Sequence, residues 1–134
     1  MKKAFLAVSY GHKEVLQAEI ASIVRILKQL SIKTLVFVHK YSFKPEREKE
    51  MMRMALDEVR DSDIIIAEAS DRAIGVGVEI GYAKSLNKPI VYIRKESAEY
   101  SCALGGVSDL KLVYKDVKDL ERKLFDLFFN VFTM

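Results

Sequence analysis

Residues 62–93 read SDIIIAEASDRAIGVGVEIGYAKSLNKPIVYI, which is a strand pattern, a glycine-rich turn, a helix pattern and a second strand pattern in succession. The apolar runs at residues 63–68 and 89–93 are typical of strands that helices cover on both faces. Residues 76–86 between them are predicted to form a helix. Because crossovers of this kind join parallel strands with a right-handed connection, the segment predicts two parallel strands in one sheet.

The rest of the chain repeats this alternation, with 3.6-residue spacing of apolar side chains in the helical stretches. Further helices are predicted around residues 16–27, 52–59 and 117–129, and further strands at residues 4–9, 34–38 and 110–114. We therefore predict a single α/β domain over residues 1–134. Its expected architecture is a three-layer, Rossmann-like (flavodoxin-like) fold with a five-stranded parallel sheet in the order 2-1-3-4-5.

Composition excludes several classes of protein. The 134 residues are 50% apolar and 31% charged, so the chain can bury a core, and its net charge of +3 does not favour binding to a nucleic acid polymer. No apolar run approaches the roughly 20 residues of a membrane span. The single cysteine, Cys102, allows no internal disulfide, and the start of the chain has no signal-peptide pattern. We expect a cytoplasmic protein.

The fold rule places ligands beyond the carboxyl ends of parallel strands. That rule selects four loops for the chemistry, at residues 9–13, 39–43, 69–79 and 94–106. The loop at 69–79 has the densest signal, because a glycine-rich turn there, with Gly75 and Gly77 as candidate substrate-binding residues, leads into a helix with Glu79 near its start.

Each feature of that loop also has a structural explanation. Gly75 and Gly77 would permit a tight turn, Gly81 would let the helix approach the sheet, and Glu79 would interact favourably with the positive helix start. The spacing G-x-G-x-x-x-G differs from the dinucleotide fingerprint and follows the third strand, so a nicotinamide cofactor is not indicated. Cys102 has no Cys or His at ligand spacing, so neither a metal nor another cofactor is expected.

Taken together, residues 62–93 resemble the nucleoside 2-deoxyribosyltransferase superfamily, and most closely its nucleoside 5'-monophosphate N-glycosidase branch. The resemblance implies that Glu79 is the nucleophile that attacks the anomeric carbon of the sugar. A carboxylate suits this role, because it stabilises an oxocarbenium-like transition state before bonding to it. Hydrolysis of the glycosyl-enzyme ester, or transfer to a second base, would retain the anomeric configuration.

The same resemblance implies roles for further residues around the sugar. It places Asp63 near the sugar and base, although a capping role at the amino end of its strand is an equal alternative. Glu68, at the favoured carboxyl end, is a second candidate. Phe5 stands where deoxy-specific relatives carry a tyrosine, which predicts weaker discrimination against a ribose 2'-hydroxyl, with a plain core phenylalanine as the alternative.

The 5'-phosphate has several candidate ligands. The resemblance implies that Ser101 is contributed across a dimer interface, whereas the family's serine before the glycine-rich turn is Ala73 here and an arginine of the same branch is Gly105. Ser9 and His12 could meet the anion at the start of the first helix, with a solvated His12 as the alternative.

Two classes of function remain open. One is an N-glycosidase of nucleoside or deoxynucleoside 5'-monophosphates, with base exchange as its variant, and the other is a catalytically silent nucleotide-binding regulatory module.

Two further features concern base binding and assembly. The rings of His39, Tyr41 and Phe43 could stack on a base. Surplus aromatic residues in the last helix indicate a homodimer or a higher homo-oligomer.

Overall fold

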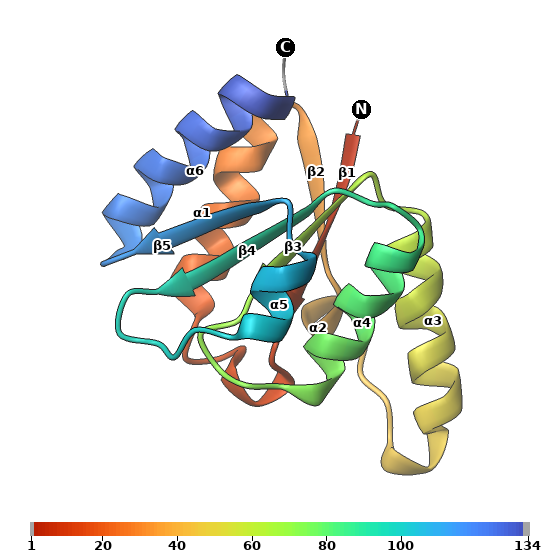
Figure 1. Ribbon diagram of the computed structural model, residues 1–134. Coiled ribbons are helices and arrows are strands. Elements are labelled where there is room, and N and C mark those ends of the chain that lie inside the picture. The colour runs from red at the N-terminus through yellow and green to blue at the C-terminus, as the bar shows by residue number, and fades with distance from the viewer. Residues whose placement is uncertain (1, 133–134) are drawn as a thin grey trace.

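A computed structural model describes residues 2–132, and its centre is a five-stranded parallel sheet (Figure 1). The strands are β1 (Lys2–Val8), β2 (Ile32–Val36), β3 (Ile64–Glu68), β4 (Ile90–Lys95) and β5 (Leu110–Tyr114). Their order is β2-β1-β3-β4-β5, and every neighbouring pair is parallel. The predicted fold class and strand order are confirmed.

Helices cover both faces of the sheet (Figure 1). One layer holds α1 (Gln17–Gln29) and α6 (Val117–Phe132), which pack against each other. The opposite layer holds α2 (Phe37–Lys40), α3 (Glu48–Arg60), α4 (Ile74–Ser85) and α5 (Cys102–Val107). None of the helices within residues 2–132 has the length and apolar character that crossing a bilayer requires.

Alternate side chains of the strands pack in two separate cores, because successive side chains of a strand point to opposite faces of the sheet. Leu6 and Ile66 face α1 and α6, whereas Phe5, Ile65 and Ala67 face α3 and α4. The continuous apolar runs of the sequence therefore pack against the helices on both faces of the sheet.

The second strand was predicted too late in the chain. β2 ends at Val36, the last residue that pairs with β1, and the chain then turns into α2. Phe37 is thereby buried in the core on the α3 and α4 side, so the predicted strand at residues 37–38 is wrong. An edge strand has only one pairing partner, and its apolar composition did not reveal where that pairing stops.

The start of the first helix and the loop after β4 also differ from the predictions. A 3₁₀ turn at Tyr10–His12 follows β1, and α1 begins only at Gln17, so Ser9 and His12 do not lie at its start. The predicted loop after β4 contains α5, whose Ser101 caps the helix by accepting a hydrogen bond from the Leu104 N–H at 3.2 Å.

Candidate active site

A cavity of about 620 Å³ opens at the carboxyl edge of the sheet, in the layer of α2, α3 and α4. Its volume lies within the ordinary range for small-molecule sites. Four separate segments meet around it: the end of β1 with the 3₁₀ turn, α2 with the chain after it, α3, and the first turns of α4.

Glu79 supplies the carboxyl group of this cavity. Among the lining residues within 2–132, it is the one side chain of the Asp, Glu, Lys, Arg or His type. No hydrogen bond or ion pair joins it to another residue in that range. Burial alone raises the pKa of Glu79 to about 7. The carboxyl group therefore ionises closer to neutral pH than a free glutamate does, and no residue within 2–132 pairs with it.

The structural explanation for Glu79 does not hold. It is the sixth residue of α4, in the second turn, and the first turn contains no acidic residue. The interaction of a carboxylate with the positive helix start falls off beyond the first turn, so it contributes little at this position.

Aromatic rings form a wall of the same cavity. Phe37, Tyr41 and Phe43 line it, with ring centroids 4.9 Å apart between Phe37 and Tyr41 and 6.4 Å apart between Phe37 and Phe43. Met51 and Met52 of α3 add thioether side chains. A wall of this composition can stack on a flat ring.

Three of the predicted site residues, Ser9, Gly75 and Glu79, line this cavity. Ser9 is buried, with 8% of its surface exposed. A Cβ atom on Gly75, Gly77 or Gly81 would meet no atom within 4 Å, and none of these glycines has a positive φ. Neither the tight turn nor a close approach to the sheet explains them. Gly75 lines the same cavity as Glu79.

A second, larger cavity of about 910 Å³ lies beside the first and holds two of the predicted site residues. Gly77 and Ser101 line this cavity and not that of Glu79. Ala73 and Val76 line both cavities, so the first turn of α4 separates them. At Gly105, an added Cβ would meet the Tyr100 hydroxyl, so a larger residue there would require the partly exposed Tyr100 side chain to shift.

Glu68 is a buried carboxyl group on the opposite face of the sheet. It accepts hydrogen bonds from the Ser70 N–H at 2.7 Å, from the Ser70 hydroxyl at 2.8 Å and from the Tyr114 hydroxyl. Burial raises its pKa, and these hydrogen bonds and the nearby Lys95 oppose the rise. Its oxygens are occupied, and it does not line the cavity of Glu79.

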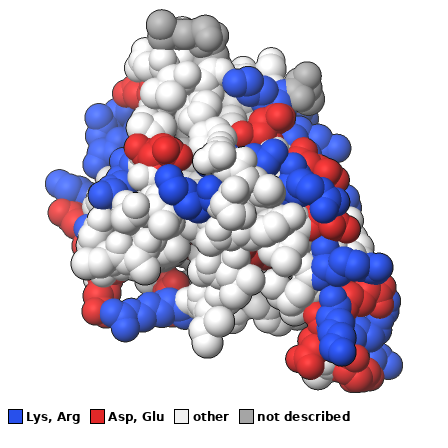
Figure 2. All heavy atoms as spheres, turned by 45° about the vertical axis from the view of Figure 1, so that its right-hand side comes forward, with Lys and Arg blue, Asp and Glu red and all other residues white. Residues whose placement is uncertain are grey.

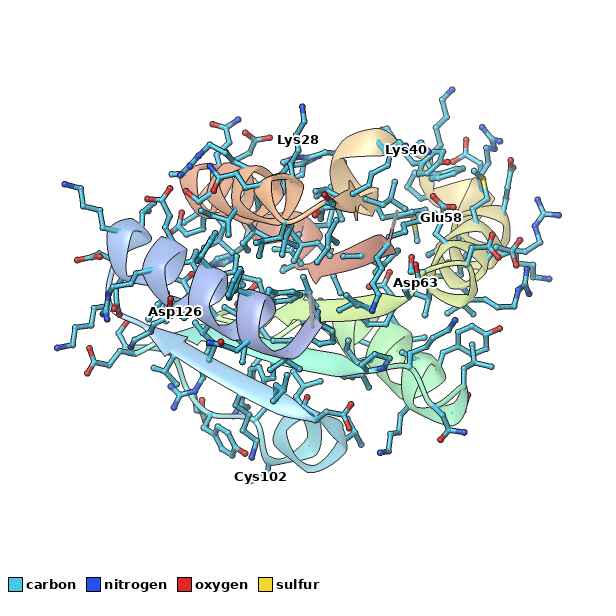
Figure 3. The ribbon with its side chains drawn as sticks, turned by 90° about the horizontal axis from the view of Figure 1, so that it is seen from above. Lys28, Lys40, Glu58, Asp63, Cys102 and Asp126 are labelled. Carbon is cyan, nitrogen blue, oxygen red and sulfur yellow. The ribbon has the colours of Figure 1, made fainter. Side chains whose placement is uncertain are left out.

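Besides Gly77, Ser101 and Glu68, three more predicted site residues do not line the cavity of Glu79. Asp63 lies at the amino edge of the sheet, where it accepts a hydrogen bond from the Lys3 N–H at 2.9 Å (Figure 3). Phe5 is fully buried, 6.3 Å from Phe37 between ring centroids, so it lies one layer behind the aromatic wall. His12 is paired with Asp71, Nδ1 to Oδ2 at 2.9 Å.

Several cavity residues were not predicted from the sequence. Tyr10, Phe37, Met51, Met52 and Ala55 come from three segments, and each fits an ordinary core or surface pattern there. Of the predicted stacking residues, Tyr41 and Phe43 line the cavity and His39 is exposed elsewhere. Within the described part of the chain, no group of three His, Cys, Asp or Glu side chains is placed to hold a metal ion.

Fold and site together define a class of protein. A solitary carboxyl group beside an aromatic wall, at the carboxyl edge of a flavodoxin-like sheet, is suited to an enzyme that binds a flat ring and attacks the carbon attached to it. A family model described as nucleoside 2-deoxyribosyltransferase matches residues 4–132, and the chain belongs to that family. It is therefore an enzyme that acts on the N-glycosyl bond of nucleosides or nucleotides.

Individual relatives agree with this family. The protein named "Putative 2'-deoxynucleoside 5'-phosphate N-hydrolase 1" from Syntrophotalea carbinolica is 44% identical over 41 residues, a stretch that spans 31% of this chain and 29% of that relative. The solved structure of Clostridium botulinum CMP N-glycosidase, BcmB, superposes with a TM-score of 0.70 at 23% identity, covering 95% of this chain and 99% of the other. A 2-deoxyribosyltransferase from Bacillus psychrosaccharolyticus superposes with a TM-score of 0.68 at 18% identity, covering 91% and 95%. At these identities the two structures show a shared fold.

Proposed function

We propose that the protein is a retaining N-glycosidase that removes the base from nucleoside or deoxynucleoside 5'-monophosphates. One observation carries the proposal: the Glu79 carboxyl group, which has no partner within residues 2–132, lies in a cavity whose aromatic wall fits a nucleobase. The family match and the named relatives support the choice of bond and of substrate class.

The proposed reaction has two steps at the anomeric carbon. An oxygen of ionised Glu79 bonds to C1', the C1'–N bond breaks, and its electron pair leaves with the base. The oxygen of a water molecule then bonds to C1', the ester bond between C1' and Glu79 breaks, and a proton of the water returns to the group that protonated the base. This step releases the sugar phosphate with retained configuration and restores the Glu79 carboxylate. Because two displacements occur on the same carbon, the product has the anomeric configuration of the substrate.

The departing base needs a proton, and neither Asp63 nor Glu68 is within the cavity to supply one. Besides Glu79, the lining side chains with polar atoms within residues 2–132 are Ser9, Tyr10 and Tyr41. We propose that a tyrosine hydroxyl or bound water donates to the base. The sugar and phosphate would lie toward Ser9 and Gly75, where a buried hydroxyl and the open first turn of α4 adjoin Glu79.

A homodimer would bring Ser101 to this phosphate. Ser101 lines the neighbouring cavity in its own chain, so we propose that it serves the site of a second copy. Ile74 and Val78 on α4 are 90% and 46% exposed, and Phe125 on α6 is 36% exposed. Figure 2 shows a broad uncharged surface over α4 and α5, in contrast to the charged surface of α3. Sedimentation as a stable monomer at micromolar concentration would contradict this assembly.

We also propose that the protein is located in the cytoplasm.

Base exchange is the second candidate, and the name of the matched family favours it. It differs only in the acceptor, because a ring nitrogen of a second base replaces water at C1'. Adding a free base to the reaction distinguishes the two, since a transferase produces a new nucleotide.

The test of the proposed function is chromatography of free base from CMP, dCMP and the other ribo and deoxyribo monophosphates. We expect release by the wild type and none by Glu79→Gln. A glycosyl adduct on the peptide that contains Glu79 should be detected by mass spectrometry after acid quench. Binding of monophosphates without release of base would instead indicate a silent module.

A further inference from the structure

The outer edge of β2 is a free edge of the sheet. Among residues 2–132, β2 pairs with β1 alone, so it remains open on its other side. Such an edge presents a row of backbone N–H and C=O groups without a partner strand. A groove of about 900 Å³ is lined by residues of α1, β2 and α2, and we call it the β2 groove. It shares no lining residue with either cavity at the carboxyl edge of the sheet.

The β2 groove follows the strand edge itself and not one face of the sheet. Residues 33–36 of β2, four in succession, all line it. Successive side chains of a strand point to opposite faces, and here Val36 packs in the core beside α1 whereas Leu35 packs in the core beside α3. An extended chain in this groove is therefore placed to hydrogen-bond with the free backbone groups of β2.

The β2 groove is basic. Arg25, Lys28, Lys33 and Lys40 line it, and no Asp or Glu within residues 2–132 does. Arg25 and Lys40 are each paired with a glutamate outside the groove. Lys28 and Lys33 form no ion pair with the described residues. Figure 3 shows Lys28 and Lys40 on the same side of the molecule, so the positive charge is concentrated along this edge.

The β5 edge, at the opposite side of the sheet, has a different charge pattern. A groove of about 540 Å³ there is lined by Lys111 and Lys123, but Asp126 lines it too. Lys33 on β2 and Lys111 on β5 are both exposed. A lysine on an edge strand opposes pairing with an apolar strand or with a second copy of the same edge. The surplus of cations at β2 consequently favours a strand with acidic side chains.

The α1 side of the β2 groove is apolar. Ile20, Ala21 and Val24 line it, and Ala21 and Val24 retain exposed surface. Lys33 points away from α1, because it alternates along the strand in step with Leu35. The groove thus matches an amphipathic strand, with one apolar face toward α1 and one acidic face toward Lys33.

We propose that the β2 edge binds an extended segment of a partner protein in which Asp or Glu alternates with aliphatic residues. Backbone hydrogen bonds join the segment to β2 as an additional strand of the sheet. Its aliphatic side chains pack on Ala21 and Val24, and its carboxylates face Lys33. A second copy of this chain does not fit, because lysine would face lysine across the pair.

The test is a titration of the full chain with three synthetic peptides, followed by NMR of the backbone amides. The acidic probe is acetyl-Glu-Val-Glu-Ile-Glu-Val-Glu-amide. A second peptide has Lys in place of every Glu, and a third has Pro in place of the central Ile, which removes a donor and prevents strand pairing. We expect the acidic probe to bind about tenfold more tightly than the proline peptide, and the basic peptide not to bind.

A matched pair of variants locates the binding. Lys33→Glu and Lys111→Glu reverse an exposed charge on the two opposite edge strands. We expect Lys33→Glu to weaken binding of the acidic probe by about tenfold and Lys111→Glu to change it by less than about twofold. Thermal melting of both variants shows that they are folded.

Hydrogen exchange separates an additional strand from loose attraction between charges. With the acidic probe bound, amides of β2 should exchange more slowly and those of β5 should not change. Absence of binding at about millimolar probe overturns the proposal, as does equal binding of the proline peptide or undiminished binding to Lys33→Glu. Tighter binding of an oligothymidylate than of the acidic probe would assign the groove to a nucleic acid and would also overturn it.

Discussion

Glu68 is a buried and Glu79 a partly buried carboxyl group near the same edge of the sheet, and burial raises the pKa of both. On one face, Glu68 is held by Ser70 and Tyr114. On the other face, Glu79 has no hydrogen-bonding partner among residues 2–132 and adjoins a cavity. Burial and a shifted pKa therefore do not by themselves identify a functional carboxyl group. An unsatisfied carboxyl group beside open space is the better indicator.

The largest expected effect comes from Glu79→Gln. If Glu79 is the nucleophile, base release should fall by at least about a thousandfold, because an amide cannot form the glycosyl ester.

The same Glu79→Gln substitution should make the folded protein more stable at pH 8. The pKa of Glu79 is higher in the folded state than in the unfolded state, so the wild type loses stability as the pH rises from 4.5 through 7, and Gln does not ionise. We expect a gain of roughly 2 to 3 kcal/mol by urea unfolding.

Glu68→Ala should show the opposite pattern. Removing this carboxyl group leaves the Ser70 and Tyr114 donors without their buried acceptor, so we expect a loss of about 3 kcal/mol in the free energy of unfolding. Tyr114→Phe, which removes one hydrogen bond, should lose about 1 to 2 kcal/mol. Base release per folded molecule should change by less than about threefold in both variants. A stable Glu68→Gln protein without activity would contradict the structural role of Glu68.

The pH dependence of activity tests the same difference between Glu79 and Glu68. A nucleophile has to be ionised, and the pKa of Glu79 is about 7, so kcat/KM should rise about tenfold between pH 6 and pH 8 and then level off. Stopped assays at constant ionic strength measure this profile, with circular dichroism as the control for fold. A flat profile between pH 5 and pH 8 would contradict the assignment of Glu79.

The smallest effect is expected at Asp63, a third carboxyl group at the far edge of the sheet. Asp63→Asn keeps a side-chain oxygen for the Lys3 N–H, so the free energy of unfolding should fall by less than about 1 kcal/mol. Base release should stay within about twofold of the wild type. A large loss of activity in a folded Asp63→Asn protein would return this residue to the site.

The sheet could be predicted because its signal is local. Each buried strand carries its apolar run within five to seven residues, and the β-α-β rule supplies parallel pairing without further information. Glu79, Ser9 and Gly75 could be predicted because the glycine-rich turn and the strand ends are also local. The end of β2 could not, because it depends on where β1 stops pairing.

The rest of the cavity could not be predicted because it is made by distant segments. Tyr10, Phe37 and Met52 converge only after β1, α2 and α3 have packed, and each fits an ordinary core or surface pattern in its own stretch. Asp63 and Phe5, for which the sequence left a structural role open, lie outside the cavity for a related reason. Their positions along β3 and β1 determine which edge and which depth they reach, and that depends on the completed fold.

The three glycines of α4 have a consequence for local opening. Glycine lowers the intrinsic stability of a helix by about 1 kcal/mol relative to alanine, and α4 carries three in twelve residues. Val76, Ile80 and Ala83 dock the helix on the sheet. Deuterium should consequently enter the amides of α4 through subglobal fluctuations well before it enters β3, so Glu79 is carried by a helix that depends on its docking for rigidity.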